Sequence, residues 1–206
     1  MHIKHITVKN FRCFEHLEFD LNPDINIFVG NNGSGKSAVL DAIAAAMFPY
    51  ISELQRIVGN ETEDPPFFSK DLPVTSKNNQ KVITEFLVST NDLTNWKTIY
   101  NKPLADDDTG LYRYTYSSSS SGGQKSFQSQ LESRFDLKQA NRVFDLSVIA
   151  YYKGNRNLCN DINLKTIINQ SFDRFYSLNN SFDGTANFTD LVNWFFVREF
   201  QELREG

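Results

Sequence analysis

The segment 30–37, which reads GNNGSGKS, constrains the fold of this chain more than any other feature. It fits the phosphate-binding pattern G-x-x-x-x-G-K-[ST] at every fixed position. The apolar run 25–29 precedes it, and the apolar, alanine-rich stretch 38–47 follows it. This order is typical of a strand, a glycine-rich loop and a helix. It indicates an α/β protein of the P-loop NTPase type.

Each fixed residue of this segment has a separate chemical task. Gly30, Gly33 and Gly35 let the backbone adopt positive φ and approach a phosphate without an intervening Cβ, so that successive N–H groups form an anion-binding nest. Lys36 supplies positive charge for the outer phosphates, and Ser37 offers a hydroxyl to Mg²⁺. The positive end of the following helix completes the cradle.

The expected ligand is therefore a nucleoside triphosphate with magnesium. The motif reads phosphates and not bases, so it does not distinguish ATP from GTP. The alternative interpretation is a Gly/Asn turn that contains Lys-Ser without binding anything. The expected nucleotide-binding residues of the loop are Asn31, Asn32, Gly33, Ser34, Gly35, Lys36 and Ser37.

Composition limits the class of protein. The chain has 206 residues, of which 40% are hydrophobic, so it can bury a core as a soluble globular protein. Its formal net charge of −4 excludes the overall basic field that drives non-specific nucleic-acid binding. Cys13 and Cys159 fit neither a zinc spacing nor a disulfide framework, and the apolar run 42–48 is too short to span a bilayer. We therefore expect a cytoplasmic protein with no membrane partner.

Apolar patterns predict the elements at the N-terminal end. Alternating apolar residues predict strands over 2–10 and 17–21. The run 25–29 lacks alternation, as is typical of a strand covered on both faces, so we expect it at the centre of a sheet. The apolar spacing after Lys36 predicts a helix with one buried stripe, which Pro49 must break or kink.

The middle of the chain reads as an antiparallel β subdomain. A polar, proline-containing connection over 60–81 leads to three predicted strands, over 83–90, 96–100 and 111–116. The serine- and glycine-rich segment 117–123 then reads as a flexible loop.

The last third is predicted to be mainly helical. A helix over 127–142 leads to a second apolar strand over 143–152, and helices with apolar faces follow within 163–206. We expect these helices to continue into a missing C-terminal half. The predicted domains are a P-loop core at 1–59, a connection with the β subdomain at 60–125, and a helix, core strand and C-terminal helices at 126–206.

Two sets of residues resemble known families. The stretches IKHITVKNFRCF (3–14) and INIFVGNNGSGKSAVLDAI (25–43) resemble the opening of the ABC-type ATPases related to SMC and RecF, and this resemblance covers residues 1–47. The stretches AYYKGNR (150–156) and NFTDLVNWFFVRE (187–199) resemble prokaryotic AAA-family ATPases of the OLD, PtuA and retron-associated kind, many of which serve in anti-phage defence.

The resemblance implies roles for residues outside the loop. In the SMC and RecF group the arginine at the position of Arg12 commonly reaches the nucleotide phosphates; the alternative is an arginine paired with a surface carboxylate. A polar residue at a strand end reaches magnesium or the attacking water in ABC-type folds. Asn155 and Arg156 are the candidates here, and a strand-end turn is the alternative.

The chain also departs from the ABC-type pattern. Such sites hydrolyse ATP between two heads, where one head supplies an acidic pair after a strand and the partner supplies a Ser-Gly-Gly-Gln-like signature. No apolar run here ends in Asp-Glu, and the sequence SGGQ at 121–124 reads either as a signature core or as a flexible loop. No catalytic residue is therefore identified, and we expect this chain to bind nucleotide but to hydrolyse it poorly or not at all.

Two functions follow as hypotheses. The first is the Mg-ATP-binding lobe of a dimerising SMC/RecF-like ATPase, a homodimer or higher oligomer through its heads. It would gate an effector such as a nuclease or a DNA-processing partner, in anti-phage defence or DNA processing. The second is a nucleic-acid or protein-binding module with a structural or vestigial nucleotide site. Its candidate stacking and phosphate-contacting residues are Trp96, Tyr100, Tyr112, Tyr114, Tyr116, Lys97, Lys102 and Arg113.

Overall fold

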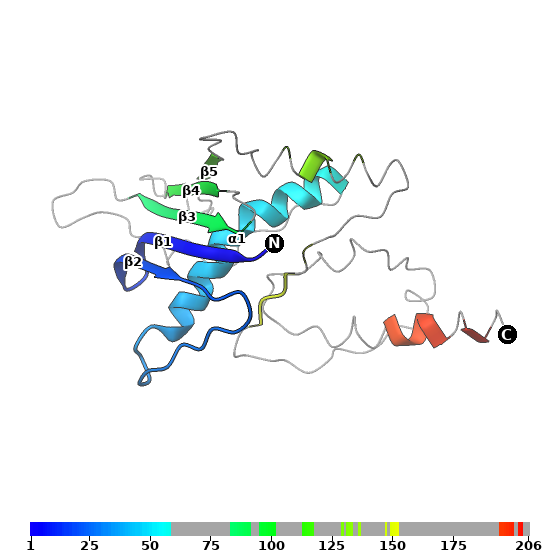
Figure 1. Cartoon of the computed structure of the whole chain (residues 1–206), viewed down its shortest axis with the longest axis horizontal. Coiled ribbons are helices and arrows are strands. Elements are labelled where there is room, and N and C mark those ends of the chain that lie inside the picture. The colour runs from blue at the N-terminus through cyan, green and yellow to red at the C-terminus, as the bar shows by residue number, and fades with distance from the viewer. Residues whose placement is uncertain are drawn as a thin grey trace, which may run out of the picture. The chain divides into compact units, whose positions relative to one another are not determined.

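In the computed structural model the chain forms two compact units, Met1–Ser147 and Val148–Gly206. Figure 1 labels the strands and the helix of the first unit. The first unit holds the sheet, the glycine-rich loop and the long helix. The residues that the structure describes are 1–58, 83–91, 95–101, 113–117, 129, 131–133, 136, 147, 149–152, 194–199 and 202–203.

One antiparallel sheet organises the first unit. Its strand order is β2-β1-β3-β4-β5. The two N-terminal strands, which were predicted from alternation, and the three later predicted strands are confirmed, and β1 pairs directly with β3. Strands from the predicted segments 1–59 and 60–125 therefore share a single sheet. The strands are β1 (Ile3–Phe11), β2 (Phe14–Asp20), β3 (Thr84–Thr90), β4 (Asn95–Asn101) and β5 (Arg113–Ser117).

An irregular backbone conformation at Asn10 shifts the alternation of buried and less buried residues along β1. Ile6 and Val8 are fully buried, as their alternation predicts, but the next buried side chain is Phe11. Asn10 has φ of 54°, a left-handed conformation that asparagine tolerates better than most residues, and this interrupts the alternation. Its amide Nδ2 donates to the Ile83 carbonyl oxygen at 2.9 Å, so the irregular residue is tied to the segment that leads into β3.

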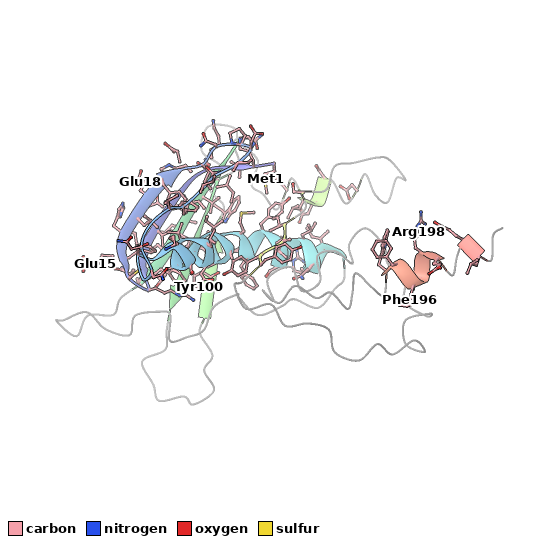
Figure 2. The ribbon with its side chains drawn as sticks, turned by 90° about the horizontal axis from the view of Figure 1, so that it is seen from below. Met1, Glu15, Glu18, Tyr100, Phe196 and Arg198 are labelled. Atoms are coloured by element: carbon pink, nitrogen blue, oxygen red, sulfur yellow. The ribbon has the colours of Figure 1, made fainter. Side chains whose placement is uncertain are left out.

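Helix α1 (Lys36–Val58) packs against one face of this sheet (Figure 2). Aromatic side chains of β1, β3 and β4 form the centre of the core. The Phe86 ring makes edge-to-face contacts with Phe11 at 5.3 Å and with Tyr100 at 5.5 Å between ring centroids. Small side chains on α1, Ala42, Ala45 and Ala46 among them, are buried and let the helix approach the sheet closely.

Of the two predicted effects of Pro49, a break or a kink, the break is not found, because the helix continues to Val58. Proline lacks the N–H that would donate to the carbonyl oxygen of Ala45 four residues earlier. The Tyr100 hydroxyl donates to that oxygen at 3.1 Å, and the Trp96 indole Nε1–H donates to the neighbouring Ala46 oxygen at 2.8 Å. Side chains of β4 therefore bond the helix carbonyls in the turn that Pro49 disturbs.

The prediction that residues 25–29 form a central strand is also wrong. They have no regular secondary structure, and no strand among the described residues pairs with them. Ile25, Ile27 and Val29 are 74%, 79% and 89% exposed. Apolar composition alone does not make a strand, since its N–H and C=O groups need the partners that an adjacent strand supplies.

By length and composition, α1 could cross a membrane, and it is the one such helix in the described part of the chain. However, 78% of its most apolar window is buried inside the structure, as is typical of the core helix of a folded domain. The apolar run 42–48, taken from the sequence as too short to span, is the centre of this helix.

The structure describes only parts of the last third of the chain. Residues 129, 131–133 and 136 are helical, as predicted. Residues 149–151 do not belong to a strand and Tyr152 forms an isolated bridge, so the predicted strand over 143–152 is not found at these positions. Residues 194–199 are helical, and the predicted apolar face at Phe195 and Phe196 is exposed within its unit. The segments 60–81 and 118–123 lie outside the described residues.

Candidate functional site

The phosphate-binding segment forms a tight loop at the N-terminus of α1. The Ser34 N–H donates to the Asn31 carbonyl oxygen at 3.2 Å, which closes a turn. Gly33 and Gly35 have φ of +82° and +92°. The first helical bond runs from the Val39 N–H to the Gly35 oxygen at 2.9 Å, so Gly35 is the N-cap of α1.

The three glycines differ in backbone conformation and in the space around them. At Gly33 the requirement is conformational, because a Cβ there would meet nothing within 4 Å but φ is positive. At Gly35 a Cβ would also lie 3.1 Å from Phe14 Cζ and 3.3 Å from Cys13 Sγ. At Gly30 φ is not in the left-handed region, contrary to the prediction for all three glycines, and a Cβ would lie 2.6 Å from Ser34 Oγ, the end of a short side chain that can rotate away.

Lys36 folds back over the loop. Its Nζ donates to the carbonyl oxygens of Gly30 at 2.8 Å and of Asn31 at 2.7 Å. Residues 30–34 are exposed, and α1 has no acidic side chain in its first turn. The positive end of the helix and one ammonium group therefore meet at an open loop with no carboxylate of that turn to offset them, and this combination suits a polyphosphate.

A magnesium ion fits this site only together with a phosphate. Ser37 is exposed in the first turn of α1, where its hydroxyl can supply one oxygen ligand. Within the described ranges, no group of three or more His, Cys, Asp or Glu side chains could hold a metal. Mg²⁺ usually takes one or two protein ligands, with substrate phosphates and waters completing its octahedron. The donor set at Ser37 agrees with that pattern.

Arg12 pairs with a carboxylate on α1. Its Nη1 donates to Asp41 Oδ2, and its guanidinium carbon lies 5.5 Å from the centre of the Phe11 ring. The Asp41 side chain is 8% exposed, so its partner is a largely buried carboxylate and not the surface carboxylate considered from the sequence. The phosphate-contacting role of Arg12 stays a prediction.

Sequence reasoning missed Asp41 and the turn that joins β1 and β2. Asp41 is the one charged residue in the apolar stretch 38–52, and a lone carboxylate there signals a buried cationic partner. No sequence signal indicates that Cys13 and Phe14 lie against Gly35. Asn155, Arg156 and the SGGQ segment 121–124 lie outside the described residues.

Two of the aromatic residues expected to stack on nucleic-acid bases, Trp96 and Tyr100, have described side chains, and these do not form an exposed stacking surface. Trp96 and Tyr100 are buried against α1, with their polar atoms bonded to its carbonyls. Lys97 Nζ lies 2.7 Å from Glu85 Oε1, and the hydrogen bond from Lys97 lowers the pKa of Glu85. Trp96 and Tyr100 thus belong to the core, and Lys97 belongs to an ion pair between β3 and β4. The remaining candidates, Tyr112, Tyr114, Tyr116, Lys102 and Arg113, have no described side chains.

Comparison with known proteins places the sequence of this chain in a family. Residues 5–203 match a family model described as an AAA domain, AAA_23. The structural maintenance of chromosomes protein 6 of Saccharomyces cerevisiae is 47% identical over 55 residues, which are 27% of this chain and 5% of that protein.

Bacterial relatives match over a similar length. The DNA replication and repair protein RecF of Lactobacillus acidophilus is 46% identical over 43 residues, and that of Lactococcus lactis subsp. cremoris is 49% identical over 43 residues. Each match covers 21% of this chain and 12% of the relative. The chain thus matches an eighth or less of the length of these curated relatives.

Proposed function

Because the chain belongs to the AAA_23 family of AAA domains, which its match over residues 5–203 shows, we propose that it is the Mg-ATP-binding lobe of an SMC/RecF-like ATPase. Segments of the chain are 46–47% identical to SMC protein 6 and to a RecF, and this supports the more specific assignment. The single observation that carries the proposal is the loop 30–37, with its two left-handed glycines and its lysine at a helix N-terminus.

ATP and Mg²⁺ are the proposed ligands of this loop. The backbone N–H groups of residues 33–37 and the Lys36 ammonium would hold the phosphates, and the Ser37 hydroxyl would contribute to the magnesium ion. When bound, the metal would supply positive charge that offsets the charge of the phosphates. We also propose low hydrolysis by this chain alone, because no apolar run in its sequence ends in the Asp-Glu pair that ABC-type sites use.

The oligomer and the partners are proposed on resemblance. We propose a homodimer or higher oligomer formed through ATPase heads in the cytoplasm, which gates a nuclease or another DNA-processing effector. The names of the relatives refer to chromosomes and to DNA replication and repair, which supports a link to DNA. The prokaryotic anti-phage role rests on the resemblance of residues 150–156 and 187–199 to OLD, PtuA and retron-associated ATPases.

Substitution of the loop lysine tests nucleotide binding directly. Lys36→Ala removes the ammonium group that lies over the loop, and loss of one charge-assisted contact should weaken Mg-ATP binding roughly tenfold or more. The measurement is a calorimetric titration of the chain with Mg-ATP. Lys4→Ala, at an exposed lysine of β1, is the matched control and should leave the affinity unchanged.

Equal affinities of the Lys36→Ala variant and the parent chain would reject the proposal. The same titration with Mg-GTP measures base preference. Phosphate release during the titration measures hydrolysis, and rapid turnover by the chain alone would contradict the low activity proposed here.

A further inference from the structure

Asp41 is placed to act on the nucleotide site through Arg12. It lies four residues after Ser37 on α1, so the two residues share one face of the helix and are about 6 Å apart along its axis. Helical side chains lean toward the N-terminus, so the Asp41 carboxylate leans toward the glycine-rich loop. The guanidinium that it binds therefore lies near the N-terminal part of α1.

The segment that carries Arg12 is anchored at the loop as well. Arg12 has φ of 51°, a conformation that residues other than glycine seldom adopt, so the surrounding contacts must hold it. The next two residues, Cys13 and Phe14, lie against Gly35: their side-chain atoms are 3.3 Å and 3.1 Å from the position of a Cβ there. The turn between β1 and β2 is thus fixed to α1 by its arginine and to the loop by the residues that follow.

The chemistry of the pair suits a shared guanidinium. A guanidinium has five N–H donors in a planar fork, so it can bond a carboxylate on one edge and a phosphate on another. The Asp41 side chain is 8% exposed and the Arg12 side chain 28% exposed. The carboxylate is thus the more deeply buried partner, and a buried carboxylate strongly favours keeping its cation. Arg12 therefore stays on Asp41 while its side chain is still partly exposed.

We propose that Asp41 is a positioning residue of the nucleotide site, which holds the Arg12 guanidinium beside the first turn of α1 so that Arg12 can contact the phosphates of a bound nucleotide. This inference rests on the proposed function. It assigns to Asp41 no contact with nucleotide or metal. It predicts that the effect of Asp41 on affinity passes through Arg12.

The same helix supplies a matched control. Glu53 is another largely buried carboxylate of α1, and it pairs with Arg56, whose Nη2 lies 2.5 Å from Glu53 Oε1. This pair is near the C-terminal end of the helix, far from the loop along the sequence. Glu53→Gln therefore removes a buried carboxylate from an arginine on α1 without touching the Arg12 turn.

The experiment is a double-mutant cycle on the affinity for Mg-ATP, measured by calorimetric titration. Asp41→Asn should weaken binding roughly threefold to tenfold, in the range of coupling between contacting residues, whereas Glu53→Gln should leave it unchanged. Arg12→Ala should weaken binding at least as much as Asp41→Asn. In a chain that already carries Asp41→Asn, adding Arg12→Ala should lower the affinity for Mg-ATP by a smaller factor than the same change does in the parent chain. Circular dichroism at the titration temperature verifies that each variant is folded, and Asp41→Ala replaces Asp41→Asn if the latter is not.

The outcomes separate this inference from the proposed function. If Lys36→Ala abolishes binding while Asp41→Asn or Arg12→Ala leaves it unchanged, the loop binds nucleotide and the positioning role is wrong. Tighter binding by Asp41→Asn would also overturn it, because Asp41 would then withhold Arg12 from the phosphates. Fully additive losses would mean that Asp41 acts without Arg12. If Lys36→Ala has no effect, the proposed function itself fails.

Discussion

The Tyr100 hydroxyl offers a direct test of how α1 accommodates a proline. In the folded chain this hydroxyl donates to the Ala45 carbonyl oxygen at 3.1 Å, and the Tyr100 side chain is 1% exposed. The usual donor to that oxygen, the N–H of residue 49, is missing because residue 49 is proline. Tyr100→Phe therefore leaves a buried carbonyl without this donor and should cost about 1–3 kcal/mol of unfolding free energy.

The cost should depend on Pro49. In a Pro49→Ala background the restored backbone N–H can donate to the Ala45 oxygen, so Tyr100→Phe should cost about 1 kcal/mol less there than in the parent chain. The measurement is urea unfolding followed by circular dichroism for the parent, the two single variants and the double variant. Thermal unfolding gives a second measure, at about 2–4 °C for each kcal/mol in a chain of this size.

Equal costs of Tyr100→Phe in both backgrounds would refute this reasoning. The hydroxyl would then stabilise the fold by some route other than the missing helical donor. Tyr152→Phe, at a tyrosine that is 62% exposed, is the control and should change stability by less than about 0.5 kcal/mol.

Two further predictions concern the loop and the outer face of the sheet. Gly35→Ala should lower the free energy of unfolding by about 1 kcal/mol or more, and by more than Gly33→Ala does. Both positions have positive φ, but only at Gly35 would a Cβ press on Phe14. Urea unfolding of the two variants measures the difference. The hydrogen bond and charge of Lys97 lower the folded-state pKa of Glu85, so the pair stabilises the fold above the unfolded-state pKa and loses that effect as the pH falls through the folded-state pKa. Lys97→Met should therefore cost less than about 1 kcal/mol at pH 7 and nothing in acid below that range, and a cost that persists in strong acid would contradict the assignment.

Local patterns in the sequence were enough to predict much of the sheet and the loop. Alternating apolar residues mark β1 because Ile6 and Val8 are fully buried in the core while Thr7 between them is not. The spacing of glycines marks the loop because left-handed backbone at Gly33 and Gly35 is a local requirement. These are properties of a residue and its immediate neighbours, so they can be read without knowing the fold.

Hydrogen bonding between segments that are distant in the sequence could not be predicted from local patterns. Segment 25–29 has the composition of a buried strand, yet it has no strand partner among the described residues. Pro49 has the local signature of a helix break, yet Tyr100, some fifty residues later in the chain, donates to the carbonyl that the proline leaves without its donor. In both cases the outcome depends on whether a hydrogen-bonding partner from a distant segment is present.

The candidate site also combines features that the local sequence specifies with features that only the packing of distant segments produces. The order of glycines, lysine and serine in 30–37 already specifies an anion-binding loop, because backbone N–H groups and one charge suffice to hold phosphates. The pairing of Arg12 with Asp41, and the seating of Cys13 and Phe14 on Gly35, arise when β1, β2 and α1 pack together. Packing brings into contact residues that are more than twenty positions apart in the sequence, and no local pattern in the sequence encodes such contacts.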